Sequence, residues 1–258
     1  MELVANYVDY NSQQSLSAVL RWCDTAGTVP LRDVADVAKR QKLLEQWTRY
    51  AVMRSIKLEM HLRGKEWEGL FADSISGTAV TIHPSLTRVG RTSYTIQNKV
   101  TKSDSQQPLA TVETVMVQLD ASLSKAVPLT CSDELRNLCR DVPSLAERLP
   151  ETFAKRPATE ECYLWACEVR PSDCDLLGHM NNANYATLFD DARHAAGYGV
   201  DVKLAHIDYV LQAQAFEKLT IAVWRGMTEL HLNLEMINAA GATVARAFMV
   251  TFDPLSRL

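Results

Sequence analysis

Apolar and polar positions follow two different periods in the second half of the chain. Alternation of apolar with polar residues predicts strands with one buried face. It recurs in five segments, Tyr163–Arg170, Leu204–Ala213, Leu219–Arg225, Leu230–Ile237 and Thr243–Phe252. Between the first two segments, apolar residues recur instead at three- and four-residue steps, at Tyr185, Leu188, Phe189, Ala192 and Ala195. That spacing places them on one face of a helix, which we expect over Asn182–Ala196.

The first half predicts a similar order of elements. Alternation over Met1–Tyr10 predicts a strand, and apolar positions within Ser15–Ala26 predict a helix that ends at Gly27. A second helical pattern covers Leu31–Leu62 and is interpreted as a helix that breaks into a strand near Ile56. Four further strands are predicted at Leu70–Ile75, Ala79–Arg88, Ser93–Thr101 and Leu109–Asp120.

Local sequence similarity indicates that the two halves are copies of one unit. GRTSYTIQNKV from Gly90 resembles GMTELHLNLEM from Gly226, and ATVETVMVQLD ending at Asp120 resembles ATVARAFMVTFD ending at Asp253. A strand, a helix and four more strands predict an antiparallel sheet that curls around one helix in each unit. Residues 131–160 differ, because prolines and short charged helical stretches predict a surface linker there.

Composition narrows the function classes. The chain has 258 residues, with 27 Lys and Arg against 31 Asp and Glu, a formal net charge of −4. No basic block suggests a nucleic-acid partner, and no apolar run approaches the roughly 20 residues that span a membrane. The N-terminal MELVANYVDY reads as a strand and not as a signal peptide. Six cysteines without a CxxC pair are expected to be reduced and mostly buried.

Candidate chemistry gathers in Pro171–Arg193, PSDCDLLGHMNNANYATLFDDAR. Asn181 or Asn182 suits the N-cap of the predicted helix, with Asn181 the better candidate. Asp173, Asp175 and His179 come just before that helix start, where unpaired N–H groups and partial positive charge favour developing negative charge on oxygen. Asp173 is expected to be a turn or cap residue.

This run resembles the signature of hotdog-fold thioesterases, in the branch of 4-hydroxybenzoyl-CoA thioesterase-like and acyl-ACP thioesterase-like enzymes. The matching residues are Asp173, Asp175, Gly178, His179, Met180, Asn181, Asn182 and Tyr185. The resemblance implies an α+β double hotdog, with two antiparallel sheets that each curl around a central helix and form an intramolecular pseudo-dimer. We expect an N-terminal hotdog domain over residues 1–130, a linker over 131–160 and a C-terminal hotdog domain over 161–258.

The expected chemistry is hydrolysis of a thioester. Asp175 is the candidate base or nucleophile, and His179 the group that donates to the carbonyl or orients water. Asn182, or a backbone N–H between Gly178 and Asn182, is expected to stabilise the oxyanion. Gly178, Met180, Asn181, Tyr185 and Phe189 are the predicted substrate-binding residues. We expect no metal and no cofactor, because Asp175 and His179 lack a third ligand at fitting spacing.

The first half lacks this set. Superposing the two predicted helices places Tyr7 at the position of Asp175, Asn11 at that of His179 and Gln14 at that of Asn182. We therefore expect one working site, built from second-half residues and roofed by the first half. Leu177 stands where the plant acyl-ACP branch carries an Asn, two positions before the His.

The leading hypothesis is an acyl-CoA thioesterase that releases a fatty acid and CoA. The alternatives are an acyl-ACP thioesterase, an inactive acyl-binding or scaffold protein, and a hotdog dehydratase. Whether double hotdogs assemble further into a homo-oligomer is left open. Ser256-Arg257-Leu258 resembles the C-terminal peroxisomal address, which predicts a peroxisomal location in a eukaryote and a cytoplasmic one otherwise.

Overall fold

The computed structural model describes residues 2–5, 19–21, 23, 41, 51–63, 66, 78–122, 124–129, 132–149, 152–158, 161–175 and 178–253. The predicted strand Leu70–Ile75, most of the predicted helices Ser15–Ala26 and Leu31–Leu62, and the C-terminal Ser256–Leu258 lie outside these ranges. So do Tyr7, Asn11 and Gln14, the first-half positions that we compared with the motif.

The described strands form two sets of five with the same internal order. The first half contributes β1 (Glu2–Ala5), β2 (Ala51–Met60), β3 (Thr78–Val89), β4 (Ser93–Lys102) and β5 (Pro108–Gln118). The second half contributes β6 (Tyr163–Glu168), β7 (Val202–Tyr209), β8 (Lys218–Arg225), β9 (His231–Asn238) and β10 (Thr243–Thr251). The spatial order is β1-β3-β4-β5-β2-β7-β10-β9-β8-β6. Counted from its outer edge toward the middle of the sheet, each half has its strands in the order first, third, fourth, fifth and second. This shared order is expected of two copies of one unit.

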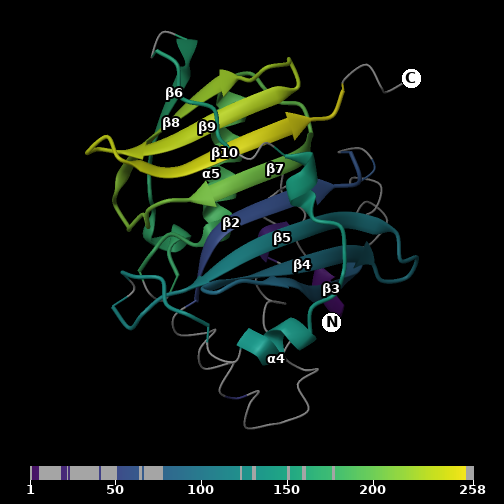
Figure 1. The fold of residues 1–258 in the computed structure, drawn as a ribbon. Helices are drawn as coiled ribbons and strands as arrows, with labels where there is room; N and C mark the ends of the chain where they lie inside the picture. The colour runs from purple at the N-terminus through teal and green to yellow at the C-terminus, as the bar shows by residue number, and fades with distance from the viewer. Residues whose placement is uncertain are drawn as a thin grey trace.

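Among the described residues the strands form one ten-stranded sheet, where two separate sheets were expected. The join is an antiparallel pairing of β2 with β7, from Ser55 opposite Asp208 to Glu59 opposite Leu204. The physical reason is that β2 and β7 are the edge strands of their halves. Their free N–H and C=O groups are satisfied by pairing with each other. The α+β class with antiparallel strands and few helices is confirmed (Figure 1).

The strand β2 begins earlier than predicted. It runs from Ala51, so the expected helix over Leu31–Leu62 does not extend through this region, although Gln41 is helical. Ile56, Leu58 and Met60 are at most 2% exposed and point to one face, and the intervening residues point to the other. Because β5 and β7 pair with β2 on both sides, sheet pairing decides its conformation over the local helical pattern.

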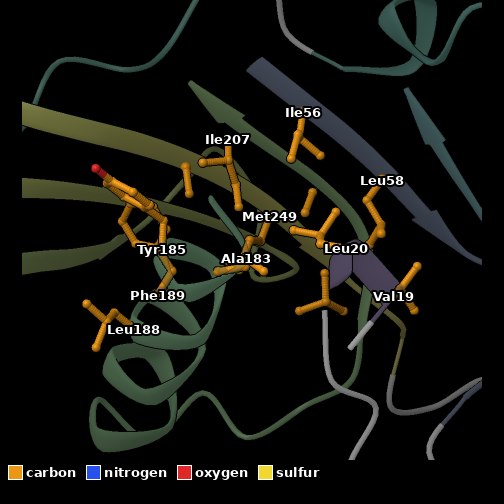
Figure 2. Packing of buried hydrophobic residues seen from close by; sticks show 14 of the residues in the cluster. Val19, Leu20, Ile56, Leu58, Ala183, Tyr185, Leu188, Phe189, Ile207 and Met249 are labelled. Atoms are coloured by element: carbon orange, nitrogen blue, oxygen red, sulfur yellow. The ribbon is translucent and has the colours of Figure 1, made fainter. Parts of the chain in front are cut away.

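The helix α5 (Asn182–Ala195) packs its apolar face against one face of the sheet, as predicted. Asn181 caps it, because its Oδ1 accepts the N–H of Ala183 at 2.9 Å. Phe189 and Ala183 are fully buried in a core that also holds Val19 and Leu20 of the first-half helix. Figure 2 shows these side chains with Ile56 and Ile207, which lie opposite each other across the β2–β7 join. One hydrophobic core thus spans both halves.

The connection between the halves lies on the other face of the sheet. It contains the short helix α4 (Ser132–Asn137) and a 3₁₀ turn, η2 (Leu145–Arg148), in agreement with the predicted short helices. Glu113 of β5, 3% exposed, accepts from the Ser144 hydroxyl at 2.8 Å and from the Leu145 N–H at 3.1 Å. In Figure 1 the connection runs in front of the sheet and α5 lies behind it.

A second contact of this connection involves the buried His206 of β7. The ring of Phe153 covers it, with 4.7 Å between ring centroids, and Lys57 is its cross-strand partner on β2. Burial, with a smaller effect of Lys57, lowers the pKa of His206 to about 4. The Nδ1 atom of His206 has no hydrogen-bond partner in the described part of the chain. The folded state therefore favours the neutral imidazole.

We expect His206 to make folding stability depend on pH. Its pKa falls from 6.5 in the unfolded chain to about 4 in the folded one, so the unfolded state binds the proton more readily as pH drops below 6.5. The free energy of unfolding should fall through the window from pH 6.5 to 4, by at most about 3 kcal/mol. Urea unfolding at several pH values measures it. Subtracting the curve of His206→Gln isolates the effect, and identical curves for both proteins would contradict the assignment.

Several sequence expectations concern the chain as a whole. Each helix among the described residues is too short or too polar to cross a membrane. Five of the cysteines lie in the described ranges and have free thiols, namely Cys23, Cys139, Cys162, Cys167 and Cys174. Only Cys23 among them is buried and the other four are partly exposed, so the expectation of mostly buried thiols is wrong for the described cysteines. Within the described ranges no group of three or more His, Cys, Asp or Glu side chains could hold a metal ion.

Candidate active site

The Asp-Gly-His-Met motif forms a small patch of paired backbone beside the main sheet. Cys174 pairs with Met180, and His179 pairs with Gln214, both as isolated antiparallel bridges. The Met180 N–H donates to the Ala213 carbonyl at 2.8 Å. His179 and Met180 are therefore held on one side by Cys174, which comes earlier in the motif, and on the other side by the segment that joins β7 to β8. The role of that segment was not visible in the sequence.

Asp175 and His179 close the loop between them. The Asp175 N–H donates to the His179 carbonyl at 2.8 Å, and the Gly178 N–H donates to the Asp175 carbonyl at 3.0 Å. The Asp175 carboxylate accepts the His179 N–H at 3.3 Å. Gly178 has a φ of +78°, a conformation that residues with a side chain rarely adopt. The loop therefore fixes the backbone of Asp175 and leaves its carboxylate at the exposed surface.

The helix α5 starts three residues beyond His179. The Asn181 N–H donates to the Asp173 carbonyl at 2.9 Å, and the Asn184 Nδ2 donates to the same carbonyl at 2.7 Å. The Tyr209 hydroxyl donates to the Asn182 carbonyl at 3.1 Å. Asn182 is thus the first residue of α5, half-buried and anchored from β7. The structure brings Asp175, His179 and Asn182 into one short loop and helix start.

Asp173 has the structural role that the sequence indicates. It is 6% exposed and accepts from the Arg170 side chain, at 3.0 Å from Nη2 and 3.1 Å from Nε. It also accepts the Arg170 N–H at 2.9 Å and caps the 3₁₀ turn η4 (Pro171–Asp173). Its carboxylate is therefore fully engaged, and Asp175 is the acid of this pair that solvent reaches.

The predicted substrate-binding residues separate into two groups. Gly178 is exposed and Asn181 half-buried at the loop, whereas Met180, Tyr185 and Phe189 are at most 3% exposed. The Tyr185 hydroxyl accepts the Ala213 N–H at 3.0 Å, and its ring lies edge-on to Tyr209. Burial raises the pKa of Tyr185 to about 12. In this structure Met180, Tyr185 and Phe189 are core residues, and an acyl path past the two aromatic rings stays a prediction.

Near the motif, Cys174 is unsuited to act as a nucleophile, and Arg193 does not form a surface ion pair. Burial, with the negative charges of Asp173 and Asp175, raises the pKa of the Cys174 thiol. Arg193 pairs with Asp190, with 2.5 Å between Nε and Oδ1, but it does so at 3% exposure and not at the surface. Its Nη1 also donates to the carbonyls of Tyr198 and Val200, so Arg193 holds the C-terminal end of α5 in place.

Three exposed apolar side chains lie in or next to the segment that pairs with the motif. Val210, Leu211 and Phe216 are 42%, 46% and 69% exposed. Phe216 has a φ of +68°, which costs a non-glycine residue roughly 1–2 kcal/mol. Its N–H donates to the Val169 carbonyl at 2.7 Å, which fixes this conformation. Phe216 therefore occupies a strained position without gaining burial.

We expect Phe216→Gly to raise the free energy of unfolding by about 0.5–1 kcal/mol, because relief of the strain exceeds the added freedom of the unfolded chain. Urea unfolding monitored by circular dichroism measures it. Phe216→Ala is the matched control: it removes the same ring but keeps a Cβ at positive φ, so it should not stabilise. Equal effects of the two variants would contradict the strain.

One region of the chain matches a known protein family. Residues 169–253, which contain the motif, match the model of the Thioesterase-like superfamily. Among curated protein sequences none matches this chain. The signature resemblance is thus confirmed for the region that carries it, and the remainder of the chain is characterised through its fold.

Solved structures share that fold over nearly the whole chain. An acyl-ACP thioesterase from Bacteroides thetaiotaomicron has a TM-score of 0.72 at 14% identity, covering 98% of this chain and 96% of that chain. A 12:0-ACP thioesterase from Umbellularia californica has a TM-score of 0.72 at 14% identity, covering 97% and 95%. A MaoC-like dehydratase from Phytophthora capsici is less similar, with a TM-score of 0.50 at 9% identity and coverage of 81% and 72%.

These findings give the chain the fold of the solved tandem hotdog proteins, and they limit the family match to residues 169–253. The full-length match agrees with the duplicated order of strands.

Proposed function

We propose that this protein hydrolyses acyl thioesters, with Asp175 as the general base or nucleophile. The proposal is supported by the different environments of Asp173 and Asp175, the two acids before α5. The Asp173 carboxylate is buried against Arg170, whereas the Asp175 carboxylate is exposed and accepts the His179 N–H in the loop just before the helix cap. An ionised carboxylate in that place has access to water and to a substrate carbonyl.

Each group has a defined task in the general-base route. Asp175 takes a proton from water, and the hydroxide adds to the thioester carbon. Negative charge then develops on the carbonyl oxygen. The His179 ring can donate to it, as can the N–H of Asn182, which has no intrahelical acceptor at the first position of α5. Collapse breaks the C–S bond, and the sulfur leaves as the thiol after taking up the proton.

The nucleophilic route uses the same residues. An Asp175 oxygen attacks the thioester carbon and expels the thiolate, which leaves an acyl anhydride on the protein. Water then hydrolyses the anhydride and regenerates the carboxylate. Both routes release one carboxylic acid and one thiol, so the products do not distinguish them.

We place this site in the second of two hotdog domains, residues 161–258, joined to the first, residues 1–130, by the linker at 131–160. The identical strand order of the two halves and the β2–β7 join support an intramolecular pseudo-dimer. The core shared by Val19, Leu20 and α5 supports a first half that roofs the site.

The carrier of the acyl group is proposed to be CoA. Leu177 stands where the plant acyl-ACP branch has an Asn, which favours CoA, whereas the two most similar folds reported above belong to enzymes named for ACP substrates. In a eukaryote, the C-terminal Ser256-Arg257-Leu258 would place a CoA-dependent enzyme in the peroxisome or a related organelle, and otherwise the enzyme would be cytoplasmic. That location stays a prediction.

The test is release of free thiol from matched acyl-CoA and acyl-ACP substrates over a range of acyl chain lengths. The proposal expects turnover with at least one chain length, and a higher kcat/KM with CoA. A higher kcat/KM with ACP would reverse the carrier assignment and leave hydrolysis intact. Tight binding of acyl-CoA with no thiol release would favour an acyl-binding scaffold instead.

A further inference from the structure

Arg21 belongs to the first half but reaches the motif of the second. It lies in the first-half helix beside Val19 and Leu20, and its Nη2 donates to the Asn184 Oδ1 at 2.8 Å. The two residues are 163 positions apart in the chain. Asn184 is in the first turn of α5 and is 9% exposed, and this contact joins its side chain to the first half.

The Asn184 carboxamide connects Arg21 to the motif. Its Nδ2 donates to the Asp173 carbonyl at 2.7 Å, in a buried hydrogen bond. A guanidinium only donates hydrogen bonds, so the amide oxygen must face Arg21 and the amide nitrogen must face Asp173. Without Arg21 the amide loses one of the two groups that select this orientation, and only the Asp173 carbonyl still opposes a flip. The flipped amide would place two oxygens against each other at Asp173.

The Asp173 carbonyl is the point where the acidic segment is tied to α5. It accepts from both Asn184 Nδ2 and the Asn181 N–H. The next residue, Cys174, pairs with Met180, and Asp175 follows it. A shift of the Asp173 carbonyl therefore moves the backbone of Asp175 relative to His179 and the helix start.

We propose that Arg21 is a positioning residue for the Asp175 site, acting through Asn184 and the Asp173 carbonyl. The first half then does more than cover the site, because it supplies one side chain that sets the position of the acid in the second half. This inference rests on the proposed thioesterase function. Since general-base catalysis is sensitive to small displacements, the expected effect is on turnover more than on substrate affinity.

The experiment compares Arg21→Ala, Arg21→Lys and the wild-type chain by thiol release from the best acyl thioester of the panel. We expect Arg21→Ala to lower kcat by about tenfold with KM changed less than about twofold, as for loss of a supporting contact. Lys can donate to Asn184 and should recover most of the loss. Millimolar guanidinium added to Arg21→Ala should recover part of it. Arg91→Ala, an exposed arginine in the turn between β3 and β4, is the matched control and should behave as wild type.

The outcomes separate the two proposals. Wild-type kcat in Arg21→Ala, or a raised KM with unchanged kcat, overturns the positioning role and leaves the thioesterase intact. Equal loss in Arg21→Lys, with no recovery by guanidinium, also overturns it, because a general loss of structure would then explain the result. Absence of turnover in the wild-type chain itself would overturn the function and the positioning role together.

Discussion

Asp175→Asn is expected to lower kcat for thioester hydrolysis by at least about 100-fold, because general-base catalysis contributes about 10²–10⁴ in rate. The asparagine Oδ1 can still accept the His179 N–H that the carboxylate accepts at 3.3 Å. The loop geometry is therefore kept while the charge and the basicity are removed. Release of free thiol, followed with a thiol-reactive chromophore at saturating substrate, measures the change.

Asp104→Asn is the matched control for this variant. Asp104 is an exposed acid in the turn between β4 and β5, where it pairs with Lys102. Removing its charge should change kcat less than about twofold, because exposed pairs contribute little. A turnover of Asp175→Asn equal to that of Asp104→Asn would remove Asp175 from the mechanism.

Phe189→Ala is expected to lower the free energy of unfolding by about 3–5 kcal/mol, the range for removing a buried aromatic side chain from a core. Phe189 is 0% exposed, and it packs in the cluster that joins α5 to both halves of the sheet. The loss includes the transfer of the ring to water and the cavity left between α5 and the strands. Urea unfolding monitored by circular dichroism measures it.

Met227→Ala provides the comparison for Phe189→Ala. Met227 is 98% exposed in the turn before β9, so its replacement should change stability by less than about 0.5 kcal/mol. A loss of under about 1 kcal/mol in Phe189→Ala would contradict the central place of this residue in the core, and would instead agree with a ring that lines an open acyl path.

The helix at the motif shows what local pattern can predict. The spacing from Tyr185 to Ala195 and the capping side chain of Asn181 lie within one continuous segment, and the structure places α5 at Asn182–Ala195 with that cap. The second-half strands fall within a few residues of their predicted bounds for the same reason. Each has one face on a single core, so the period of two appears in the sequence.

The β2 strand shows where local pattern fails. Its residues carry apolar side chains at spacings that also suit a helix, and only its partners β5 and β7 decide the outcome. The same pairing explains the single sheet in place of the expected two. A pairing between residues 55–59 and 204–208 is set by which strand edges remain free after each half has folded, which no local period records.

Within the candidate site, sequence reasoning could find the residue types but not their supports. The motif order places Asp175, His179 and Asn182 near one helix start because they are close in the chain. From distant positions, Arg21 and Tyr209 reach the first turn of α5, and Ala213–Gln214 pairs with the loop before it. Asn184 lies inside the motif, but its burial and its contacts with Arg21 and the Asp173 carbonyl appear only in the structure.

Hydrolysis in ¹⁸O-labelled water, analysed by mass spectrometry over many turnovers, tests the central chemistry most directly. If an ionised Asp175 activates water or forms an acyl intermediate that water cleaves, the wild-type chain will yield one thiol and one ¹⁸O-bearing acid for every thioester consumed. Asp175→Asn will yield almost none of either. Recovery of intact, unlabelled thioester from the wild-type chain would contradict the account.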